Sequence, residues 1–583
     1  SPQDVEWAVA DDRLYMLQSR PITVMGHEEI GKDVKGKYVL FKPLIENFTE
    51  PLTPLTADLW RKALPPGIDL IQGWIYVNFK AFRPIFPYKI SDEEAANLLY
   101  SLDTNTSQMK LSLAKLPVFL VFLFVGSLIF AVTYARTRNL PDDFMDGFRD
   151  LCQKVERDPA YGPIETFFRL LTWTRFFDPI GNMVMMVNWS AGRYFFLMDV
   201  LKKLIRRWLP NLREDAADIL TAGGQGVLSV EMGRGIWSLA DTAKKNPQVR
   251  QLIEQHKPGK VLERLQAEPG GQDFVQQLTD FLAVHGHRGL KELEFRSPRW
   301  EEDSTPILGM IRNYLLVDSD PVGHEKKMQV IRDRLSSQIV EQLAPLPLET
   351  RFKPRWRVLQ HLIQRIKYFA KMRENSRFYH IMGFYMVRKK ILRIEAEFMQ
   401  QGKLRCKDDI FYLLWDEVNG LQSDRLGWTD VEDQVHRRRM EHIRHSKMFP
   451  PKLIGFKAQS ESQAAEPDEG DTLTGQAASS GTYEGVAHVI LNPAADIELK
   501  PGEILVAPYT DPAWTPLFLT AGAAVVEVGS YLSHAGTVAR EFGMPCVVDV
   551  SDCTKRIHSG TRVKVNGDEG SIRIVSEEEG GKA

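Results

Sequence analysis

His534 is the residue of this sequence whose setting most clearly favours chemistry. It follows Ser533 where a strand-like run ends and a helix-like run begins, in EVGSYLSHAGTVAREFGMP. Ser533 is a good N-cap residue, so His534 falls in the first turn of the predicted helix. A helix N-terminus disfavours imidazolium and its free N–H groups favour phosphate. The position predicts a neutral imidazole that can attack phosphorus, although a histidine that merely caps or fills fits the same residues.

The elements that must position this histidine lie at the end of the chain. Residues 481–576 alternate short β runs, such as EILVAP and AAVVEV, with two helix candidates, WTPLFLTA and HAGTVAREF. Residues 456–480 are rich in Ser, Ala, Gly and acidic residues, which indicates a flexible linker. Residues 40–455 are mostly helical in pattern. The predicted fold is multidomain, a large, mostly α-helical domain followed by a small β/α domain.

The charge balance and the cysteine content restrict the binding partners and the cellular location that we expect for the protein. The 74 Lys and Arg residues nearly balance the 76 Asp and Glu residues, with no long block of one sign, so binding to nucleic acid is not indicated. The four cysteines show neither CxxC spacing nor a cluster. This pattern suits a reduced, cytoplasmic location and argues against a zinc module or a disulfide framework.

A second dense polar group occupies HGHRGLKEL and the nearby PRW. Two histidines that lie two residues apart suit neither one helix face nor a usual zinc set, and no cysteine accompanies them. We therefore interpret the group as a structural polar network, in which Arg288 and Glu292 form an internal pair. Its members are His285, His287, Arg288, Glu292, Arg299 and Trp300.

The stretch EVGSYLSHAGTVAREFGMPCVV resembles the phosphohistidine signature of the phosphoenolpyruvate-utilising, or dikinase, family. Within that family the chain is most similar to the rifampin phosphotransferases over nearly its whole length. The matching stretches include TDPAWTPLF, VEMGRGIWSLAD, FLAVHGHRGLKELEF, MRENSRFYHIMGF and KDDIFYLLWDEV. The resemblance implies an ATP-grasp domain, a helical acceptor-binding domain at 40–455, and a swivelling domain at 481–576 whose histidine carries a phosphoryl group between them.

The resemblance also implies roles for particular residues. His534 would be the phosphorylated histidine. Arg373 and Arg377 would lie where the acceptor hydroxyl meets the phosphohistidine and neutralise charge there, with Glu374 beside the acceptor. The family motif usually has Lys where this sequence has Arg377, which keeps the charge and alters its geometry. A solvated basic helix face is the alternative reading of the same residues.

Residues 1–25 read as two strands joined at a turn. They resemble the last strands of the family's ATP-grasp domain, which implies that Glu6 helps to hold Mg²⁺ and that Gln18 and Arg20 face the phosphates of ATP. A hairpin with surface charges is the alternative. We expect this segment to be the remnant of a domain whose remaining part is supplied in cis by a longer chain or in trans by another one.

Residues 116–135 carry no charge over twenty positions and have about the length of a membrane span. A single crossing would separate the N-terminal elements from His534. We therefore expect a helix packed in or around the acceptor site. Membrane contact through this run is the alternative, which we do not favour.

The predicted activity is a phosphotransferase of the dikinase type, which converts ATP, acceptor and water to AMP, phosphate and phospho-acceptor. We expect a hydrophobic acceptor with a hydroxyl group, because FFRLLTWTRFFDPIGNMVMMVNW is rich in apolar residues. Rifamycin is one candidate. The alternatives are a phosphoenolpyruvate synthase or pyruvate dikinase-like enzyme, a condensation ligase of the same family, and a non-catalytic scaffold.

Overall fold

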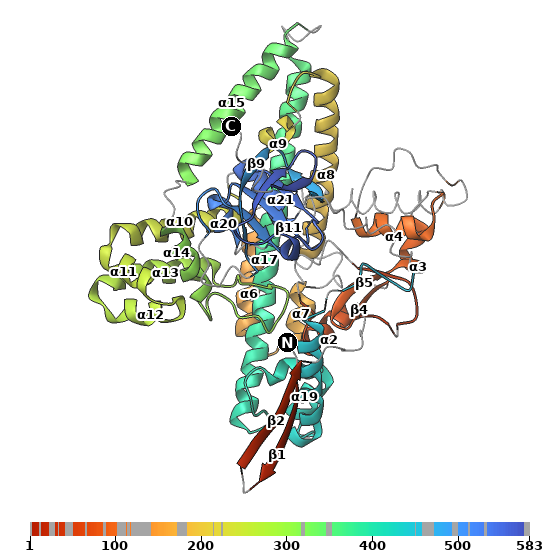
Figure 1. Cartoon of the computed structure of the whole chain (residues 1–583), viewed down its shortest axis with the longest axis vertical. Helices are drawn as coiled ribbons and strands as arrows, with labels where there is room; N and C mark the ends of the chain where they lie inside the picture. The colour runs from red at the N-terminus through yellow and green to blue at the C-terminus, as the bar shows by residue number, and fades with distance from the viewer. Residues whose placement is uncertain are drawn as a thin grey trace.

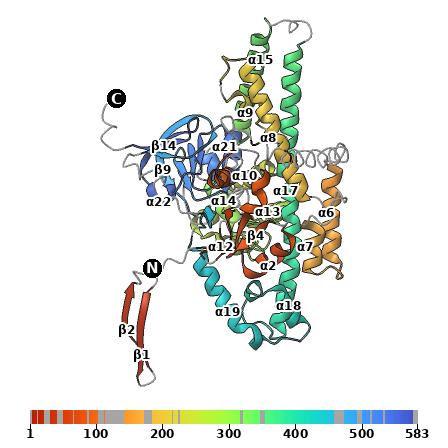
Figure 2. The ribbon, with the colours of Figure 1, turned by 90° about the vertical axis from the view of Figure 1, so that its right-hand side faces the viewer.

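We describe the chain from a computed structural model, shown in Figures 1 and 2. The described residues are 3–10, 13–21, 30–32, 34–40, 50–64, 67–85, 89–101, 112, 117, 142–171, 183–213, 215–222, 226–315, 321–345, 353–448, 450–456, 472–491, 499–510, 514–529 and 533–575.

The long helix α17 (Pro354–Gln400) runs through the helical part as its spine (Figure 1). Its apolar residues recur on several faces, so it is covered along its length. One half packs with α8 (Met183–Trp208), α9 (Ala216–Thr221) and α15 (Pro321–Leu343) around Ile366 and Phe369. The other half packs with α6 (Asp142–Arg157) and α7 (Pro163–Leu171) around Phe384.

Beside this spine, five helices form a cluster with a core of its own. Proline lies in the first turn of three of them, where its missing N–H costs nothing. Asn246 caps one by accepting hydrogen bonds from the backbone N–H groups of Gln248 and Val249. The five helices are α10 (Leu228–Lys245), α11 (Pro247–Gln255), α12 (Pro258–Ala267), α13 (Gln272–His285) and α14 (Thr305–Leu315).

A four-stranded antiparallel sheet joins the two ends of the helical part. Its order is β4-β5-β3-β6, so the last strand pairs with a strand from the beginning. The strands are β3 (Tyr38–Leu40), β4 (Ile68–Ile71), β5 (Trp74–Asn78) and β6 (Leu453–Ile454). The remaining helices of this part are α2 (Pro54–Ala63), α3 (Phe79–Phe82), α4 (Asp92–Ser101), α18 (Trp415–Gln422) and α19 (Trp428–His445), with 3₁₀ turns at Arg83–Ile85, Pro269–Gly271 and Asp409–Tyr412.

The C-terminal part is an eight-stranded sheet in the order β7-β14-β13-β9-β10-β11-β12-β8. The central strands β9 to β12 are parallel, and β10, β11 and β12 are buried on both faces, which explains the uninterrupted apolar runs ILVA and AAVV. The strands are β7 (Thr472–Thr474), β8 (Gln476–Ser479), β9 (Thr482–Val489), β10 (Ile504–Ala507), β11 (Ala523–Val526), β12 (Cys546–Val548), β13 (Arg562–Asn566) and β14 (Ser571–Ile574). The helices are α20 (Thr515–Thr520), α21 (His534–Phe542) and α22 (Cys553–Arg556).

The architecture expected from the sequence, a mostly helical part followed by a small β/α part, is confirmed, with a correction at the boundary. Residues 472–479, assigned above to the 456–480 linker, form β7 and β8 at the two edges of the C-terminal sheet. Leu473 and Ala478 are buried there. The linker prediction was wrong for these residues because small side chains are also compatible with edge strands. Residues 457–471 lie outside the described part.

Two further expectations concern the membrane and the N-terminus. The 116–135 run lies outside the described residues, apart from Pro117. Among the helices that are described, none combines the length and apolar composition needed to cross a bilayer. Residues 3–10 and 13–21 form the antiparallel pair of β1 (Gln3–Ala10) and β2 (Arg13–Pro21), the two strands that the sequence predicted.

Candidate active site

His534 begins α21, where the sequence placed it. Ser533 is the N-cap, and its Oγ accepts a hydrogen bond from the Gly536 N–H at 3.2 Å. Ala535 and Ala539 anchor the helix in the core, and Gly543 ends it in the left-handed conformation with φ 62°. The cap and the two anchors fix the rotation of the helix, and therefore the direction of the histidine.

The surroundings of His534 keep its imidazole neutral. The ring Nε2 lies 3.2 Å from the hydroxyl oxygen of Thr515 on α20, and the ring meets Phe518 edge-on with centroids 6.3 Å apart. Burial lowers the pKa of His534 to about 3, while the Glu374 carboxylate opposes this shift and Arg377 adds to it. At neutral pH the ring therefore keeps a nitrogen lone pair that can act as a nucleophile.

Arg373 and Glu374 approach α21 from α17. Arg373 Nη2 donates to Glu374 Oε1 at 2.6 Å and to Thr537 Oγ1 at 3.1 Å, so one guanidinium links the helical part to the C-terminal part. Burial would raise the pKa of Glu374, but Arg373 and then Arg377 hold it at about 2. Ser229 Oγ donates to Glu374 Oε2 at 3.4 Å. Glu374 is thus a fixed carboxylate between two elements.

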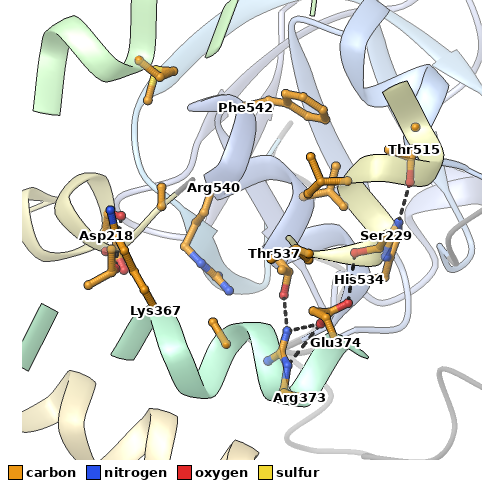
Figure 3. Close-up of a pocket in the computed structure, with 18 of the residues that line it drawn as sticks. Asp218, Ser229, Lys367, Arg373, Glu374, Thr515, His534, Thr537, Arg540 and Phe542 are labelled. Atoms are coloured by element: carbon orange, nitrogen blue, oxygen red, sulfur yellow. Dashed lines mark hydrogen bonds and ion pairs between the residues drawn. The ribbon is translucent and has the colours of Figure 1, made fainter. Parts of the chain in front are cut away.

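These side chains line a cavity of about 130 Å³ at the junction of the two parts (Figure 3). Its wall includes residues of α8, α9, α10, α14, α15 and α17 from the helical part, and of α20 and α21 from the C-terminal part. The apolar share of the wall comes from Tyr194, Ala222, Val227, Val230, Tyr314, Met328, Ala370, Leu519, Val538 and Phe542.

The structure brings together three of the four residues predicted for transfer: His534, Arg373 and Glu374. The fourth, Arg377, lies one helical turn further along α17, and its Nη2 is 3.6 Å from Glu292 Oε2. It is near enough to lower the pKa of both His534 and Glu374. Its charge acts on the site, whereas its side chain is not part of the cavity wall described here.

The polar network predicted around HGHRG is present. Arg288 and Glu292 form a buried ion pair, and the His287 Nε2–H donates to the carbonyl of Phe378 at 3.2 Å. The pair forms in an irregular segment between α13 and α14, so its four-residue spacing does not come from a helix. Within the described ranges no group of three or more His, Cys, Asp or Glu residues could hold a metal ion.

The nucleotide residues predicted at the N-terminus lie elsewhere. Glu6 pairs opposite Gln18 in the register of the hairpin, and Arg20 follows two residues later on β2. Figures 1 and 2 both show this hairpin well away from α21. The structure therefore does not bring Glu6, Gln18 or Arg20 to His534.

Sequence reasoning missed several members of the site. Thr537 lies one turn after His534, so its helical spacing is a usable signal. Thr515 and Ser229 lie in or beside quoted motifs, TDPAWTPLF and VEMGRG, without having been singled out. Arg540 lies in the quoted stretch HAGTVAREF without having been singled out, and Lys367 carried no local signal, because only the docking of α21 on α17 brings it to this cavity.

Comparison with known proteins gives two matches to family models. Residues 184–374 match the model described as the rifampicin phosphotransferase fourth domain, and residues 499–570 match the mobile domain of PEP-utilising enzymes. The first range ends at Glu374 and the second contains His534. The two matched regions therefore face each other across the cavity.

Relatives with assigned names align over nearly the whole chain. A rifampicin phosphotransferase of Streptomyces sviceus is 28% identical over 99% of this chain and 66% of the relative, and one of Bacillus subtilis is 25% identical over 98% and 66%. The prodigiosin synthesizing transferase PigC of Serratia marcescens is 29% identical over 65% of this chain and 42% of its own length. The chain thus spans about two thirds of the length of the first two relatives.

Proposed function

We propose that the chain passes a phosphoryl group from His534 to a hydroxyl of an organic acceptor. The premise is that the chain matches both the rifampicin phosphotransferase fourth domain and the mobile domain of PEP-utilising enzymes. The observation that supports the proposal most strongly is the position of His534. It is a neutral histidine at a helix start, in the wall of a cavity whose opposite wall supplies Arg373 and Glu374.

The transfer step needs a leaving imidazole, an attacking hydroxyl and a sink for negative charge. The bond between phosphorus and the His534 nitrogen breaks, the acceptor oxygen forms the new bond to phosphorus, and the hydroxyl proton goes to the released imidazole. Arg373 lines the same cavity as His534 and bonds Thr537, one turn further along α21, so it can stabilise charge on the phosphoryl oxygens. The charge of Arg377 also acts on His534. Glu374, fixed as a carboxylate, is placed to accept a hydrogen bond from the acceptor.

Loading of His534 requires a second position of the C-terminal part. We propose that this part swivels between the cavity and a nucleotide site on an ATP-grasp domain, supplied in cis or in trans. Glu6 would contribute to Mg²⁺ binding there, and Gln18 and Arg20 to binding of the ATP phosphates. A carboxylate suits Mg²⁺ and a guanidinium suits phosphate. We place the reaction in the cytoplasm, where ATP is available.

The acceptor class follows from the relatives and from the cavity wall. Two relatives are named for rifampicin, and much of the wall is apolar, so we propose a hydroxyl-bearing organic molecule with a large apolar surface. The likeness to a prodigiosin synthesizing transferase supports a second candidate, in which the phosphorylated intermediate drives a condensation. Identification of the product distinguishes a phosphate ester from a condensed molecule.

A chase experiment tests the proposal. The chain is first labelled on histidine with phosphoramidate, which needs no nucleotide site, and is then mixed with rifampicin or another hydroxylated aromatic compound. We expect the histidine label to disappear as a phosphorylated acceptor appears by mass spectrometry. A label that is lost only as inorganic phosphate, at the same rate with and without every acceptor, would contradict transfer.

A further inference from the structure

We propose that Asn375 is a positioning residue for phosphoryl transfer. Its side chain holds the first turn of α10 against α17 and thereby fixes Ser229 relative to Glu374. The inference deepens the proposed function and rests on it. Asn375 is 8% exposed and lies outside the cavity wall, whereas Ser229 and Glu374 are part of that wall. Asn375 therefore acts on the acceptor through these two residues.

The first turn of α10 has no cap from its own segment. Val227 stands at the N-cap, with φ −85° and ψ 110°, and its side chain has no oxygen that could accept a hydrogen bond. The first N–H groups of a helix need acceptors from elsewhere. Asn375 provides one from α17, since its Oδ1 accepts a hydrogen bond from the Leu228 N–H at 3.0 Å. A residue 147 positions later in the chain thus supplies the oxygen that the N-cap residue lacks.

The other half of the Asn375 amide binds the turn before α10. Its Nδ2 donates to the Gly226 carbonyl at 2.9 Å. Gly226 has φ 76°, in the left-handed region that glycine adopts readily. A Cβ at this position would lie 2.9 Å from Nζ of Lys371, which is also on α17, so this turn is in close contact with α17. The two hydrogen bonds of Asn375, here called the clamp, therefore join residues 226 and 228 to one rigid amide.

The clamp lies directly beside the bond between Ser229 and Glu374. Ser229 follows the clamped turn, and Glu374 precedes Asn375 in α17. Ser229 Oγ donates to Glu374 Oε2 at 3.4 Å, which is long for a hydrogen bond between a hydroxyl and a carboxylate (Figure 3). A bond of this length depends on the spacing of the two helices and does not set it. The shorter bonds of the clamp set that spacing next to the carboxylate that we place at the acceptor.

The clamp also determines where one wall of the cavity lies. The start of α10 supplies five residues of that wall, Val227, Ser229, Val230, Gly233 and Arg234. If the clamp is broken, this face can shift relative to Glu374. A displacement of about 1 Å between reacting groups can slow a reaction about 100-fold. His534 is positioned by its own helix, so it should still take up a phosphoryl group.

Asn246 makes the same kinds of hydrogen bond at the far end of α10. Its Oδ1 accepts from the N–H groups of Gln248 and Val249 at 3.1 and 3.3 Å, and its Nδ2 donates to the Gly270 carbonyl at 3.1 Å. Asn246 is not part of the cavity wall. Asn246→Leu therefore removes equivalent bonds without altering the contact between the first turn of α10 and α17, which makes it the matched control.

The chase of the histidine label measures the effect. The chains are labelled on His534 with phosphoramidate and mixed with rifampicin, or with whichever hydroxylated aromatic compound takes the label from the wild type. We expect Asn375→Leu to take up the label within about twofold of the wild-type rate and to pass it on about 10- to 100-fold more slowly. Gly226→Ala strains the clamped turn from its other side and should slow transfer in the same way. Asn246→Leu should stay within about twofold of the wild type in both steps.

A second readout distinguishes positioning from a general loss of stability. In a Glu374→Ala chain the carboxylate that the clamp positions is absent, so adding Asn375→Leu should slow transfer by less than about threefold further. Hydrogen exchange at residues 226–230 should be faster in Asn375→Leu and unchanged in Asn246→Leu. Equal slowing with and without Glu374, or unchanged exchange at residues 226–230, would overturn the inference. If Asn375→Leu does not fold by circular dichroism, Gly226→Ala carries the same comparisons.

The outcomes separate this inference from the proposed function. If the wild type passes its label to no acceptor, the proposed function fails and the positioning role fails with it. If the wild type transfers the label and Asn375→Leu transfers it equally fast, only the inference fails. Transfer by the wild type, together with slow transfer and normal labelling in Asn375→Leu, supports both.

Discussion

Two arginine–glutamate pairs have the same chemistry and different surroundings: Arg288 and Glu292 lie between α13 and α14, and Arg373 and Glu374 lie on α17. The side chains of Arg288 and Glu292 are 3% and 4% exposed, whereas those of Arg373 and Glu374 are 13% and 22% exposed. The first pair is enclosed by the helical part. The second lines the cavity and reaches Thr537 on the C-terminal part. The comparison indicates that the enclosed pair supports the fold and acts on His534 only through its charges, whereas the accessible pair can contact a molecule in the cavity.

The largest expected effect comes from breaking the enclosed pair. Glu292→Ala would leave Arg288 buried without its carboxylate and would remove the nearby partner of Arg377, so we expect a loss of about 3–5 kcal/mol in the free energy of unfolding. Glu374→Ala should cost about 1 kcal/mol, because water in the cavity can solvate Arg373. Urea unfolding monitored by circular dichroism measures the free energy of unfolding of both variants. Equal losses in the two variants would contradict the difference between the enclosed and the accessible pair.

The next effect concerns the accessible pair. Arg373→Ala should leave phosphorylation of His534 intact and slow discharge to the acceptor by roughly two to three orders of magnitude, the scale of losing a preorganised donor. Quench-flow measurement of the histidine label gives both rates. Arg365→Ala, on the same helix but outside the cavity wall, is the control. If phosphorylation of His534 slowed as much as discharge to the acceptor, Arg373 would instead support the fold or bind the nucleotide.

Docking of the C-terminal part should depend on pH. His534 has a pKa of about 3 when docked, and an exposed histidine has one near 6.5, so only the undocked form gains a proton between these values. The contribution of His534 to docking is therefore fully present above pH 6.5 and is lost as the pH falls towards 3. From pH 7 to pH 5 we expect the undocked population to rise about twentyfold relative to the docked one.

Energy transfer can follow this change between a dye on exposed Cys406 and one on an introduced Lys564→Cys. His534→Gln should show a much smaller response over the same pH range, because the glutamine does not titrate. A response of equal size in that variant would assign the pH dependence to other groups.

The smallest effect that we predict concerns ring orientation. Thr515→Val removes the hydroxyl that lies 3.2 Å from His534 Nε2, and we expect phosphorylation of His534 to slow about tenfold, the scale of one hydrogen bond. Thr515→Ser should restore the rate, which a purely structural role for the methyl group would not explain. The pH profile of labelling should also shift in Thr515→Val and return in Thr515→Ser.

The sequence predicted those features that depend on local chemistry. Ser533 before His534 identified the helix start, and Arg288 with Glu292 identified a pair. Contacts between distant segments were not predictable in this way. The strands at 472–479 were missed because their pairing partners lie about 70 to 100 residues later in the chain. Lys367 and Arg540 belong to one cavity only because two separate parts dock, and no spacing rule encodes that contact.

The most direct test of the account is the location of the phosphoryl group after treatment with ATP, Mg²⁺ and a complete ATP-grasp domain. With ATP labelled on its β-phosphate, we predict one label per chain that is stable in base, lost in acid, and mapped to the peptide that contains His534. His534→Gln should carry none. Equal labelling of His534→Gln, or a label mapped to Ser533 or Thr537 in the wild type, would contradict the central claim that His534 carries the phosphoryl group.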